Sequence, residues 1–165
     1  MSQETWLADL VEVTVSGFFT THHVMQTAAG ILAEMTMTGL GKKAVVRTVE
    51  GRELVIQRTN WWRGVYELRK DDLAVGEARP LGILRRNNAI RFGGHDFRLR
   101  AGDFWSRSWT LADDGDQTLV KICPRGAFRR GAILRILRPV DADLLALTYH
   151  QANVRWREQT AAAAS

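Results

Sequence analysis

Cysteine is almost absent from this chain of 165 residues, which contains Cys123 and no other. A single cysteine cannot form an internal disulfide bond, so we expect the core to hold the fold together. The first residues also lack the basic flank, apolar run and cleavage site of a secretory signal, and no twin-arginine pair stands near the start. These absences predict a cytoplasmic protein.

Long apolar runs are missing as well. A membrane-spanning helix needs ~20 apolar residues in a row, and the best candidate, residues 144–154, is interrupted by His150, Gln151 and Asn153. We therefore expect no transmembrane segment, and a protein that is soluble or peripheral at the inner membrane surface. Apolar residues make up 45% of the chain, enough for one well-buried core and too few for two, so we expect one domain over residues 1–165.

Basic charge is lacking from the first quarter of the chain. Residues 1–40 contain no Lys or Arg and carry −4, whereas residues 41–100 carry +7 and residues 101–140 carry +3. The basic charge therefore belongs to the middle of the chain. This asymmetry favours an anionic partner for that region, although arginines on the solvated face of a strand need no partner.

Hydrophobicity in the middle of the chain has a period of two. In IRFGGHDFRLR, residues 90–100, apolar side chains alternate with arginines about Gly93-Gly94, which predicts a hairpin with one apolar and one basic face. Glu50-Gly51 and Asp114-Gly115 mark two further hairpin turns. Because turn signals recur about every ten residues, we expect roughly ten to twelve short strands over residues 11–139.

Part of the chain is duplicated. The Trp-x3-aromatic-x-Leu pattern of residues 62–68 recurs at residues 105–111 with an offset of 43, and PLGILRR at residues 80–86 matches PRGAFRR at residues 124–130 with an offset of 44. Two copies are too few to close a propeller. A four-stranded unit duplicated within one barrel fits the repeat better.

In both copies the Pro-x-Gly step predicts a bend in the backbone. Proline fixes φ and donates no hydrogen bond, whereas Gly82 and Gly126 can adopt φ > 0, so each step can end one strand and turn the chain into the next. The arginine pairs that follow allow two interpretations. A bulge would let both arginines of a pair face one anion; alternatively, one is solvated and the other packs its stem along an aromatic ring.

The C-terminal stretch breaks the β pattern. Asp141 or Asp143 can cap a helix, Pro139 lies just outside it, and no glycine or further proline follows, which predicts a helix over about residues 141–158. Apolar residues go nearly all the way round this helix, so it has to be enclosed. We therefore predict a mainly β fold: a closed antiparallel barrel of about twelve strands around a buried hydrophobic helix, with residues 160–165 as a disordered tail.

This layout resembles the tubby C-terminal-like superfamily, whose relatives include the plant LURP-one-related proteins and the phospholipid scramblases, and also a group of small bacterial proteins. The resemblance covers residues 11–158 and depends on GKKAVVRT, NWWRGVYEL, the two PxGxxRR motifs and DLLAL. It implies a twelve-stranded barrel around a central helix, headgroup binding by surface Lys and Arg as in tubby, and association with phospholipid as in scramblases. The tubby headgroup motif and the cysteine-rich, palmitoylated segment of scramblases have no match here, so no site residue is carried over.

Signatures of catalysis are missing too. The sequence has no GxSxG elbow, Walker loop or HExxH, and a strand-like run follows GLGKKA at residues 39–44 where a dinucleotide fingerprint needs a helix. His22 and His23 would point to opposite faces of a strand, a poor geometry for one metal ion. We expect a protein that is not an enzyme and needs no cofactor. We expect His150 to hydrogen-bond a barrel backbone group or lie near an open end, and Cys123 to be a core thiol.

The sequence therefore predicts a non-catalytic binding module for an anionic ligand, most of all phospholipid or phosphoinositide headgroups at a membrane surface. Its contacts would be charge-assisted hydrogen bonds to phosphate oxygens. The predicted residues are Arg85, Arg86, Arg129 and Arg130, with Lys42 and Lys43 as a weaker third cluster.

Two alternatives stay open. Arginines interspersed with tryptophans give the mixture that stacks on and neutralises single-stranded nucleic acid. Tryptophans paired within a repeat are more often part of barrel packing, which we expect for Trp61, Trp62, Trp105 and Trp109. The other alternative is an interaction or structural protein with no small ligand.

Overall fold

The computed structural model describes residues 5–6, 9–103, 107–126 and 130–165. Two residues that the sequence analysis singled out, Trp105 and Arg129, lie outside the described residues.

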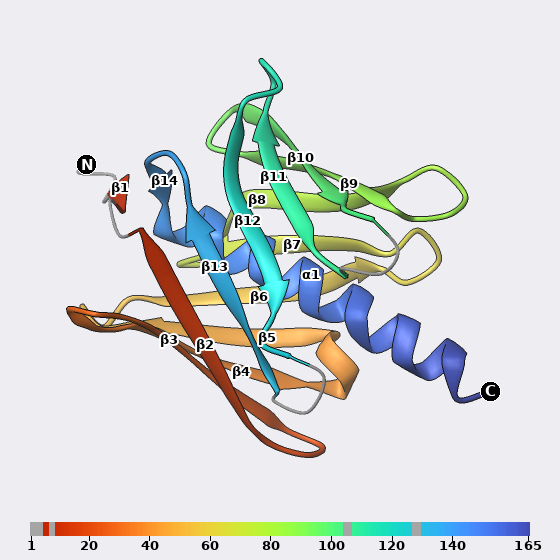
Figure 1. Ribbon diagram of the computed structural model, residues 1–165, viewed down its shortest axis with the longest axis horizontal. Coiled ribbons are helices and arrows are strands. Elements are labelled where there is room, and N and C mark those ends of the chain that lie inside the picture. Colours follow the sequence, from red (N-terminus) through yellow and green to blue (C-terminus); the bar gives the residue numbers. More distant parts are fainter. Residues whose placement is uncertain (1–4, 7–8, 104–106, 127–129) are drawn as a thin grey trace.

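Twelve antiparallel strands form a closed barrel (Figure 1). Strand β13 closes the barrel by pairing with β2, the first strand of the ring. The barrel strands are β2 (Leu10–Gly17), β3 (Thr21–Thr27), β4 (Gly30–Thr38), β5 (Lys43–Thr48), β6 (Glu53–Asn60), β7 (Val65–Lys70), β8 (Leu73–Leu81), β9 (Asn87–Phe92), β10 (His95–Ala101), β11 (Trp109–Asp113), β12 (Thr118–Pro124) and β13 (Gly131–Ile136). Two short strands outside the ring, β1 (Thr5–Trp6) and β14 (Val140–Asp141), pair with each other.

The strands follow the predicted alternation. In β6, for example, Leu54 and Ile56 are fully buried while Glu53 is exposed, because successive side chains of a strand point to opposite faces. The predicted hairpin turns at Glu50-Gly51, Gly93-Gly94 and Asp114-Gly115 connect β5 to β6, β9 to β10 and β11 to β12. Between β4 and β5 the chain makes one 3-10 turn, η1 (Gly39–Gly41).

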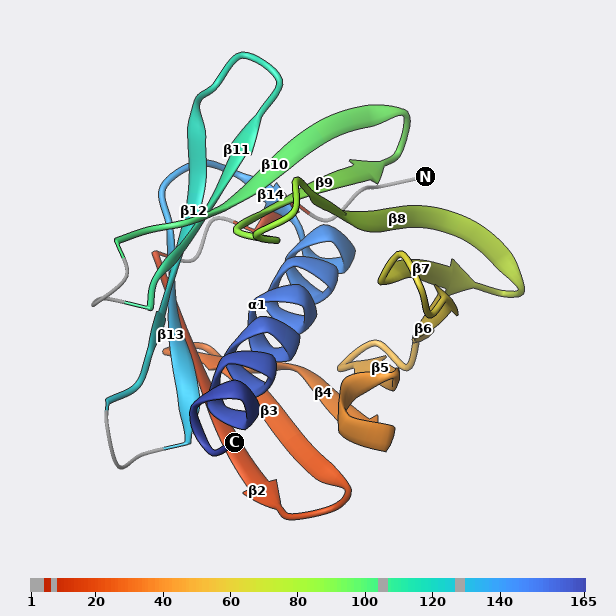
Figure 2. The same ribbon diagram turned by 90° about the vertical axis from the view of Figure 1, so that its right-hand side faces the viewer.

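Helix α1 (Ala142–Ala163) runs through the barrel (Figure 2). Asp141 caps it, since its carboxylate accepts a hydrogen bond from the backbone N–H of Asp143 at 2.8 Å. Every residue from Asp143 to Trp156 except Asn153 is buried. The predicted fold class, a closed β-barrel around a buried C-terminal helix, is confirmed.

The helix extends further than the sequence suggested. We expected it to end near residue 158 and expected residues 160–165 to be disordered, whereas α1 continues to Ala163. The reason is local: residues 161–164 are alanines, which have the highest intrinsic helix propensity, and no glycine or proline stops them.

The predicted duplication is confirmed, and strand register extends it to a third copy. The units β2–β5, β6–β9 and β10–β13 have the same register. Between the first two strands of each unit, Val13 faces Met25, Ile56 faces Leu68 and Leu99 faces Leu111. Between the last two strands, Met35 faces Val46, Ala78 faces Ile90 and Ile122 faces Leu134. These inward-facing positions recur at offsets of 43 or 44, as in the sequence repeat.

Side-chain replacement hides the first copy in the sequence. At one equivalent buried position the three units have His23, Tyr66 and Trp109, which share a ring and burial but no obvious motif. The barrel therefore consists of three copies of a four-stranded unit. Two of the three copies were recognisable in the sequence.

Because consecutive strands of the barrel pair antiparallel, successive hairpins lie at opposite ends and every second hairpin lies at the same end. We call the end at which α1 finishes the basic rim. Its hairpins consist of residues 18–20, 39–42, 61–64 and 82–86, with 102–103, 107–108, 125–126 and 130 from the last two. The end at which α1 begins is the acidic rim, made of residues 28–29, 49–52, 71–72, 93–94, 114–117 and 137–139.

Candidate functional site

Charge separates between the two rims. At the basic rim Asp103 is the one acidic residue among those that the structure describes, and it lies among Lys42, Arg63, Arg85, Arg86, Arg107, Arg125 and Arg130. At the acidic rim the described residues include Arg52 and Arg138 against Glu50, Asp71, Asp72, Asp114 and Asp116. The molecule therefore presents a positive end to anions.

The predicted contact residues reach this one end from separate hairpins. Lys42 is exposed between β4 and β5, and exposed Lys43 is the first residue of β5. Arg85 and Arg86 lie between β8 and β9, and Arg130 lies between β12 and β13. They share a rim but do not form a single cluster, because another hairpin stands between each pair of basic hairpins.

The Pro-x-Gly steps bend the chain as predicted, with φ of +72° at Gly82 and +136° at Gly126. Arg85 and Arg86 come after the bend and before β9, so they belong to a loop and the alternation of a strand does not apply to them. Arg86 is exposed and Arg85 is half-buried with φ of +49°.

Two of the predicted arginines hold neighbouring turns. The Arg85 guanidinium donates to the backbone carbonyl of Trp62 at 3.5 Å, and Arg130 donates to that of Gly17. Each therefore has a structural contact, yet each keeps further N–H groups for a ligand, since a guanidinium has five. For the part of the chain that is described, the side chains of Lys42, Lys43 and Arg86 have neither a hydrogen bond nor an ion pair.

A hollow of about 600 Å³ lies on the barrel wall beside the Arg85 loop. Arg63, Arg79 and Arg85 line it, together with one carboxylate, Glu77. Among the described residues, nothing hydrogen-bonds or ion-pairs with the side chains of Arg63, Arg79 and Glu77. Such arginines can bind a phosphate by bidentate, charge-assisted hydrogen bonds.

Sequence reasoning missed Arg63 and Arg79, although a signal for each was present. Arg63 directly follows the Trp-Trp pair of the repeat, and Arg79 directly precedes Pro80 of the motif. The hollow forms because β6, β7 and β8 are neighbours in the ring, which places these two residues beside Arg85.

Apolar side chains project from the same rim. Trp61 and Trp62 form the turn between β6 and β7, are 63% and 73% exposed, and stack on each other with ring centroids 3.7 Å apart. The expectation that they pack in the barrel is wrong, because they fall in a turn and not in a strand. Trp109, on β11, is 2% exposed and does pack in the barrel.

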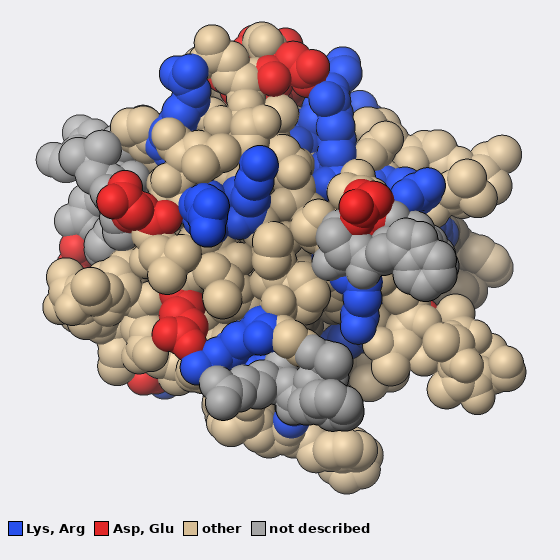
Figure 3. All heavy atoms as spheres, in the orientation of Figure 1, with Lys and Arg blue, Asp and Glu red and all other residues tan. Residues whose placement is uncertain are grey.

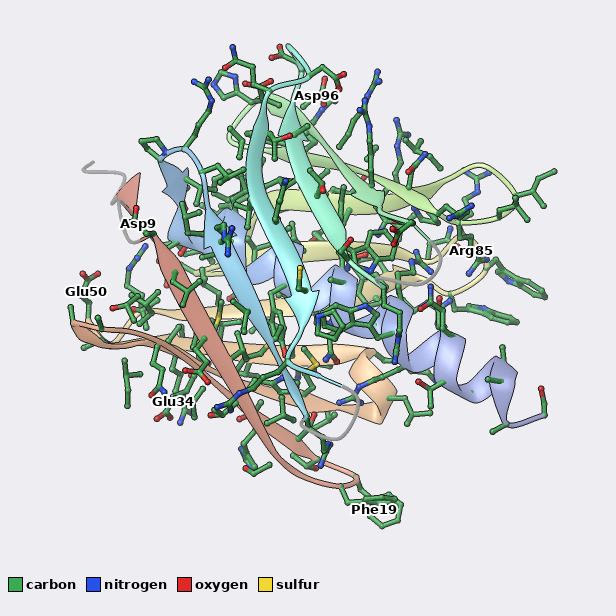
Figure 4. The ribbon with its side chains drawn as sticks, viewed as in Figure 1. Asp9, Phe19, Glu34, Glu50, Arg85 and Asp96 are labelled. Atoms are coloured by element: carbon green, nitrogen blue, oxygen red, sulfur yellow. The ribbon has the colours of Figure 1, made fainter. Side chains whose placement is uncertain are left out.

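Figures 3 and 4 show how these groups lie on the molecule. Uncharged side chains protrude at the right and at the bottom of Figure 3, the sides on which Figure 4 labels Arg85 and Phe19. Glu50 and Asp9 lie at the opposite side in Figure 4. The views agree with the assignment of the two rims.

A chain of buried polar groups lies between α1 and the wall near the basic rim. His150 donates from Nε2 to the carbonyl oxygen of Gly41 at 2.8 Å and accepts at Nδ1 from Gln151 at 3.1 Å. Gln151 in turn accepts from Asn88 at 3.3 Å. Burial lowers the pKa of His150 to about 4. His150 is therefore neutral and bonded to a barrel backbone group, as predicted.

A second buried histidine has a similar role. His23 contacts the Tyr149 hydroxyl at 2.7 Å and the Thr21 hydroxyl at 2.9 Å, and Arg157 also donates to Thr21. Burial, with a smaller effect of nearby Arg157, lowers the pKa of His23 to about 3. The neighbouring His22 is exposed, so the two histidines do point to opposite faces as expected. Both buried histidines have partners within the fold, which explains their presence without catalysis.

A small cavity of about 40 Å³ near the acidic rim is lined by apolar side chains with Arg52 and Asp143. Burial raises the pKa of Asp143 despite Arg52, whose guanidinium lies 3.4 Å from its carboxylate. The volume admits about one water molecule and excludes a lipid headgroup.

The expectation of a core thiol at Cys123 is wrong, because this cysteine is exposed. In β12 the buried residues are Val120 and Ile122, so Lys121 and Cys123 share the outer face. Within the described ranges, no three His, Cys, Asp or Glu side chains are grouped so as to hold a metal ion. Over those same ranges, no helix has the length and apolar character to cross a membrane.

One solved structure has a fold similar to that of this chain. No family model and no curated protein matches the chain. The chain is similar to the X-ray structure of the Arabidopsis thaliana protein AT5G01750, with a TM-score of 0.61 and 13% sequence identity over 88% of this chain and 91% of that one. At this identity the similarity shows a shared fold and nothing more: the chain has the barrel of the plant protein.

Proposed function

We propose that this protein is a non-catalytic module that binds phosphate-bearing ligands at its basic rim, with phospholipid or phosphoinositide headgroups of a membrane surface as the first candidates. One observation carries the proposal. Basic residues and exposed apolar side chains meet at one end of the barrel, while the other end is acidic. A negatively charged surface would attract the first end and repel the second.

The hollow beside the Arg85 loop is the proposed phosphate site. The side chains of Arg63 and Arg79 have no hydrogen-bond or ion-pair partner among the described residues, so they lose no such contact when they bind an anion. Arg85 would add one guanidinium edge while it keeps its bond to Trp62. Glu77 makes the hollow less positive, so it favours a ligand with a hydroxyl that can donate to this carboxylate beside the phosphate.

We also propose membership of the tubby C-terminal-like superfamily. The shared barrel of the Arabidopsis protein and the sequence motifs named above support it. A place at the inner membrane surface would follow from that membership and from the basic rim, and remains part of the proposal.

Single-stranded nucleic acid is the second candidate. The exposed, stacked Trp61 and Trp62 lie beside arginines, which is how stacking platforms for bases are built. The aliphatic tips of the next hairpin argue against it, because Ile83 and Leu84, 98% and 81% exposed, offer neither stacking nor hydrogen bonds to a nucleotide.

Vesicle sedimentation tests the proposal. The wild-type protein should bind vesicles that contain phosphatidylserine or a phosphoinositide and not vesicles of phosphatidylcholine alone. Arg63→Ala combined with Arg79→Ala should weaken this binding about tenfold or more, because two charge-assisted contacts are lost. Arg85→Ala with Arg86→Ala tests the predicted motif in the same way.

The matched control is Arg135→Ala with Arg138→Ala, which removes the same charge from exposed positions outside the basic rim. If control and hollow variants weaken binding equally, net charge is responsible and the site assignment is wrong. Parallel titrations with a soluble inositol phosphate and with single-stranded DNA separate the sources of phosphate. Binding of DNA alone would favour the second candidate, and binding of nothing would favour an interaction protein without a small ligand.

A further inference from the structure

The apolar tips of the basic rim carry no charge that could bind a phosphate. Of the large apolar side chains that the structure describes, the six most exposed all lie on this rim, and the next, Leu73 at 69%, lies next to the acidic rim. The six are Phe18 (82%), Phe19 (84%), Leu40 (75%), Trp62 (73%), Ile83 (98%) and Leu84 (81%). They come from four consecutive hairpins, so they form an arc along the rim.

The turns hold these side chains outward. A Cβ at Gly17, where φ is +83°, would lie 2.2 Å from the Thr20 carbonyl oxygen, so the tight turn that displays Phe18 and Phe19 requires glycine. Arg130 donates to the carbonyl of this same glycine. The two phenyl rings meet edge to face with centroids 5.2 Å apart.

The tryptophan turn is held in the same manner. Arg58 donates to the Trp61 carbonyl at 2.6 Å, and Arg85 donates to the Trp62 carbonyl. The side chain of Asn60 accepts from the Arg63 backbone N–H at 2.9 Å. These bonds use the backbone groups of the turn and leave the stacked indoles facing away from the protein.

The shape and charge of the arc select its partner. Tips on separate hairpins form a row of projections, whereas a peptide or helix would need a groove. Basic residues Lys42, Arg63 and Arg86 stand beside the tips, and indole rings favour the boundary between lipid headgroups and acyl chains. An anionic bilayer matches all three properties.

The acidic rim provides the contrast within the same molecule. Val49, 68% exposed, stands next to Glu50, and Leu73 stands next to Asp71 and Asp72. Apolar tips are thus present at this rim, but carboxylates would keep them from an anionic surface.

We propose that the arc of tips at residues 18–19, 40, 61–62 and 83–84 enters the acyl region of an anionic bilayer, so that the protein binds end-on with its acidic rim facing the aqueous phase. This inference rests on the proposed function, which brings the basic rim to the membrane. The inference adds to the proposed function that the protein penetrates the bilayer and that it does so in one orientation.

Site-specific labelling tests the insertion. Because Cys123 is the one cysteine of the chain, Cys123→Ser provides a background for Ile83→Cys, labelled with an environment-sensitive fluorophore. Val49→Cys is the matched control at the acidic rim. On vesicles of phosphatidylcholine with phosphatidylserine, the label at residue 83 should shift to the blue and be quenched by lipids brominated on their acyl chains. The label at residue 49 should do neither.

Tip variants give the second readout. Phe18→Asp with Phe19→Asp, a pair of tips outside the lining of the hollow, should weaken binding to these vesicles about tenfold or more, since carboxylates replace apolar side chains at the bilayer. The same variant should bind a soluble inositol phosphate as the wild type does. Val49→Asp with Leu73→Asp introduces the same charges at or beside the other rim and should leave vesicle binding within about twofold.

The outcomes separate the two proposals. If the protein binds the vesicles while the label at residue 83 stays in an aqueous environment, insertion is wrong and headgroup binding stands. If the soluble phosphate binds and the vesicles do not, insertion is equally wrong. Binding of neither would remove the proposed function together with the insertion.

Discussion

At the residue scale, the buried histidines show which contacts can be predicted from the sequence and which cannot. A polar side chain on an enclosed helix has to find a partner, so a backbone bond for His150 was predictable. Its acceptor, Gly41, was not, because the 3-10 turn that presents this carbonyl to the helix has no sequence pattern. The errors at Trp61, Trp62 and Cys123 have a related cause: residue type indicates hydrophobicity, but only the strand limits decide which face a residue occupies.

The two buried histidines should make stability depend on pH. Their pKa values lie near 3 and 4 in the folded protein and at 6.5 when unfolded, so the unfolded state binds more protons between these values. The free energy of unfolding is therefore highest above pH 6.5 and decreases as the pH falls from 6.5 toward the folded-state pKa values. Lowering the pH from 6.5 to 5 should reduce the free energy of unfolding by about 2 kcal/mol for each histidine.

Urea unfolding at pH 7 and pH 5 measures this effect. His150→Gln should destabilise the protein at pH 7 and reduce the loss between the two pH values to about half, since one titrating group remains. Asp143 acts in the opposite direction, because burial raises its pKa and its protonation favours the folded state. Equal stability of the wild type at both pH values would contradict the prediction.

Gly131 is a second residue with a measurable role. A Cβ there would lie 2.0 Å from the Val13 carbonyl oxygen, across the β13–β2 pair that closes the barrel. Gly131→Ala should therefore cost more than strain at φ alone, which is roughly 1–3 kcal/mol. Gly30→Ala isolates that strain, because Gly30 has φ of +136° and no atom within 4 Å of a Cβ. The free energy of unfolding of both variants can be measured by chemical denaturation. If the two variants lose equal amounts, the close contact at Gly131 does not contribute to the loss.

At the element scale, the terminal helix was the most predictable part. Its lack of a polar face required enclosure, and enclosure by strands required a closed barrel. Its C-terminal limit was missed because helix propensity, not burial, extends it through exposed alanines.

Truncation of α1 should distinguish the contribution of its buried part from that of its exposed C-terminal end. Removal of residues 161–165, all exposed, should change the free energy of unfolding by less than about 0.5 kcal/mol. Removal of residues 154–165 takes away buried Val154, Arg155 and Trp156 and should abolish cooperative thermal unfolding, because the barrel loses part of its core and Asn88 loses one of its two side-chain partners. Calorimetry of the two truncated proteins is the measurement. A cooperative transition in the shorter one would mean that the strands hold the barrel without the end of the helix.

At the scale of the whole molecule, three repeated units explain the composition of the basic rim. Phe18-Phe19 and Trp61-Trp62 stand 43 residues apart, and so do Lys42-Lys43 and Arg85-Arg86. Each of the first two units thus places one aromatic hairpin and one basic hairpin at the same end. The sequence predicted the basic pairs, whereas the shared end depends on the strand count and could not be read from any one motif.

The separation of charge between the rims predicts how salt affects vesicle binding. Raising the ionic strength from about 0.01 M to about 1 M shortens the screening length from about 30 Å to about 3 Å. The association rate with anionic vesicles should fall steeply, because long-range attraction of the basic rim is lost, while the dissociation rate changes little if apolar tips hold the bound protein. Stopped-flow measurements resolve the two rates. A dissociation rate that rises as steeply as association falls would indicate adsorption by charge alone.

The pairing of β13 with β2 also delays closure of the barrel during biosynthesis. Gly131 pairs with Thr14, and the helix that fills the barrel follows every strand of the ring in the chain. A nascent chain on the ribosome therefore exposes the apolar inner face of its first strands until more than three quarters of the 165 residues have been made. Such a topology implies slow, late folding and a need for chaperones during translation.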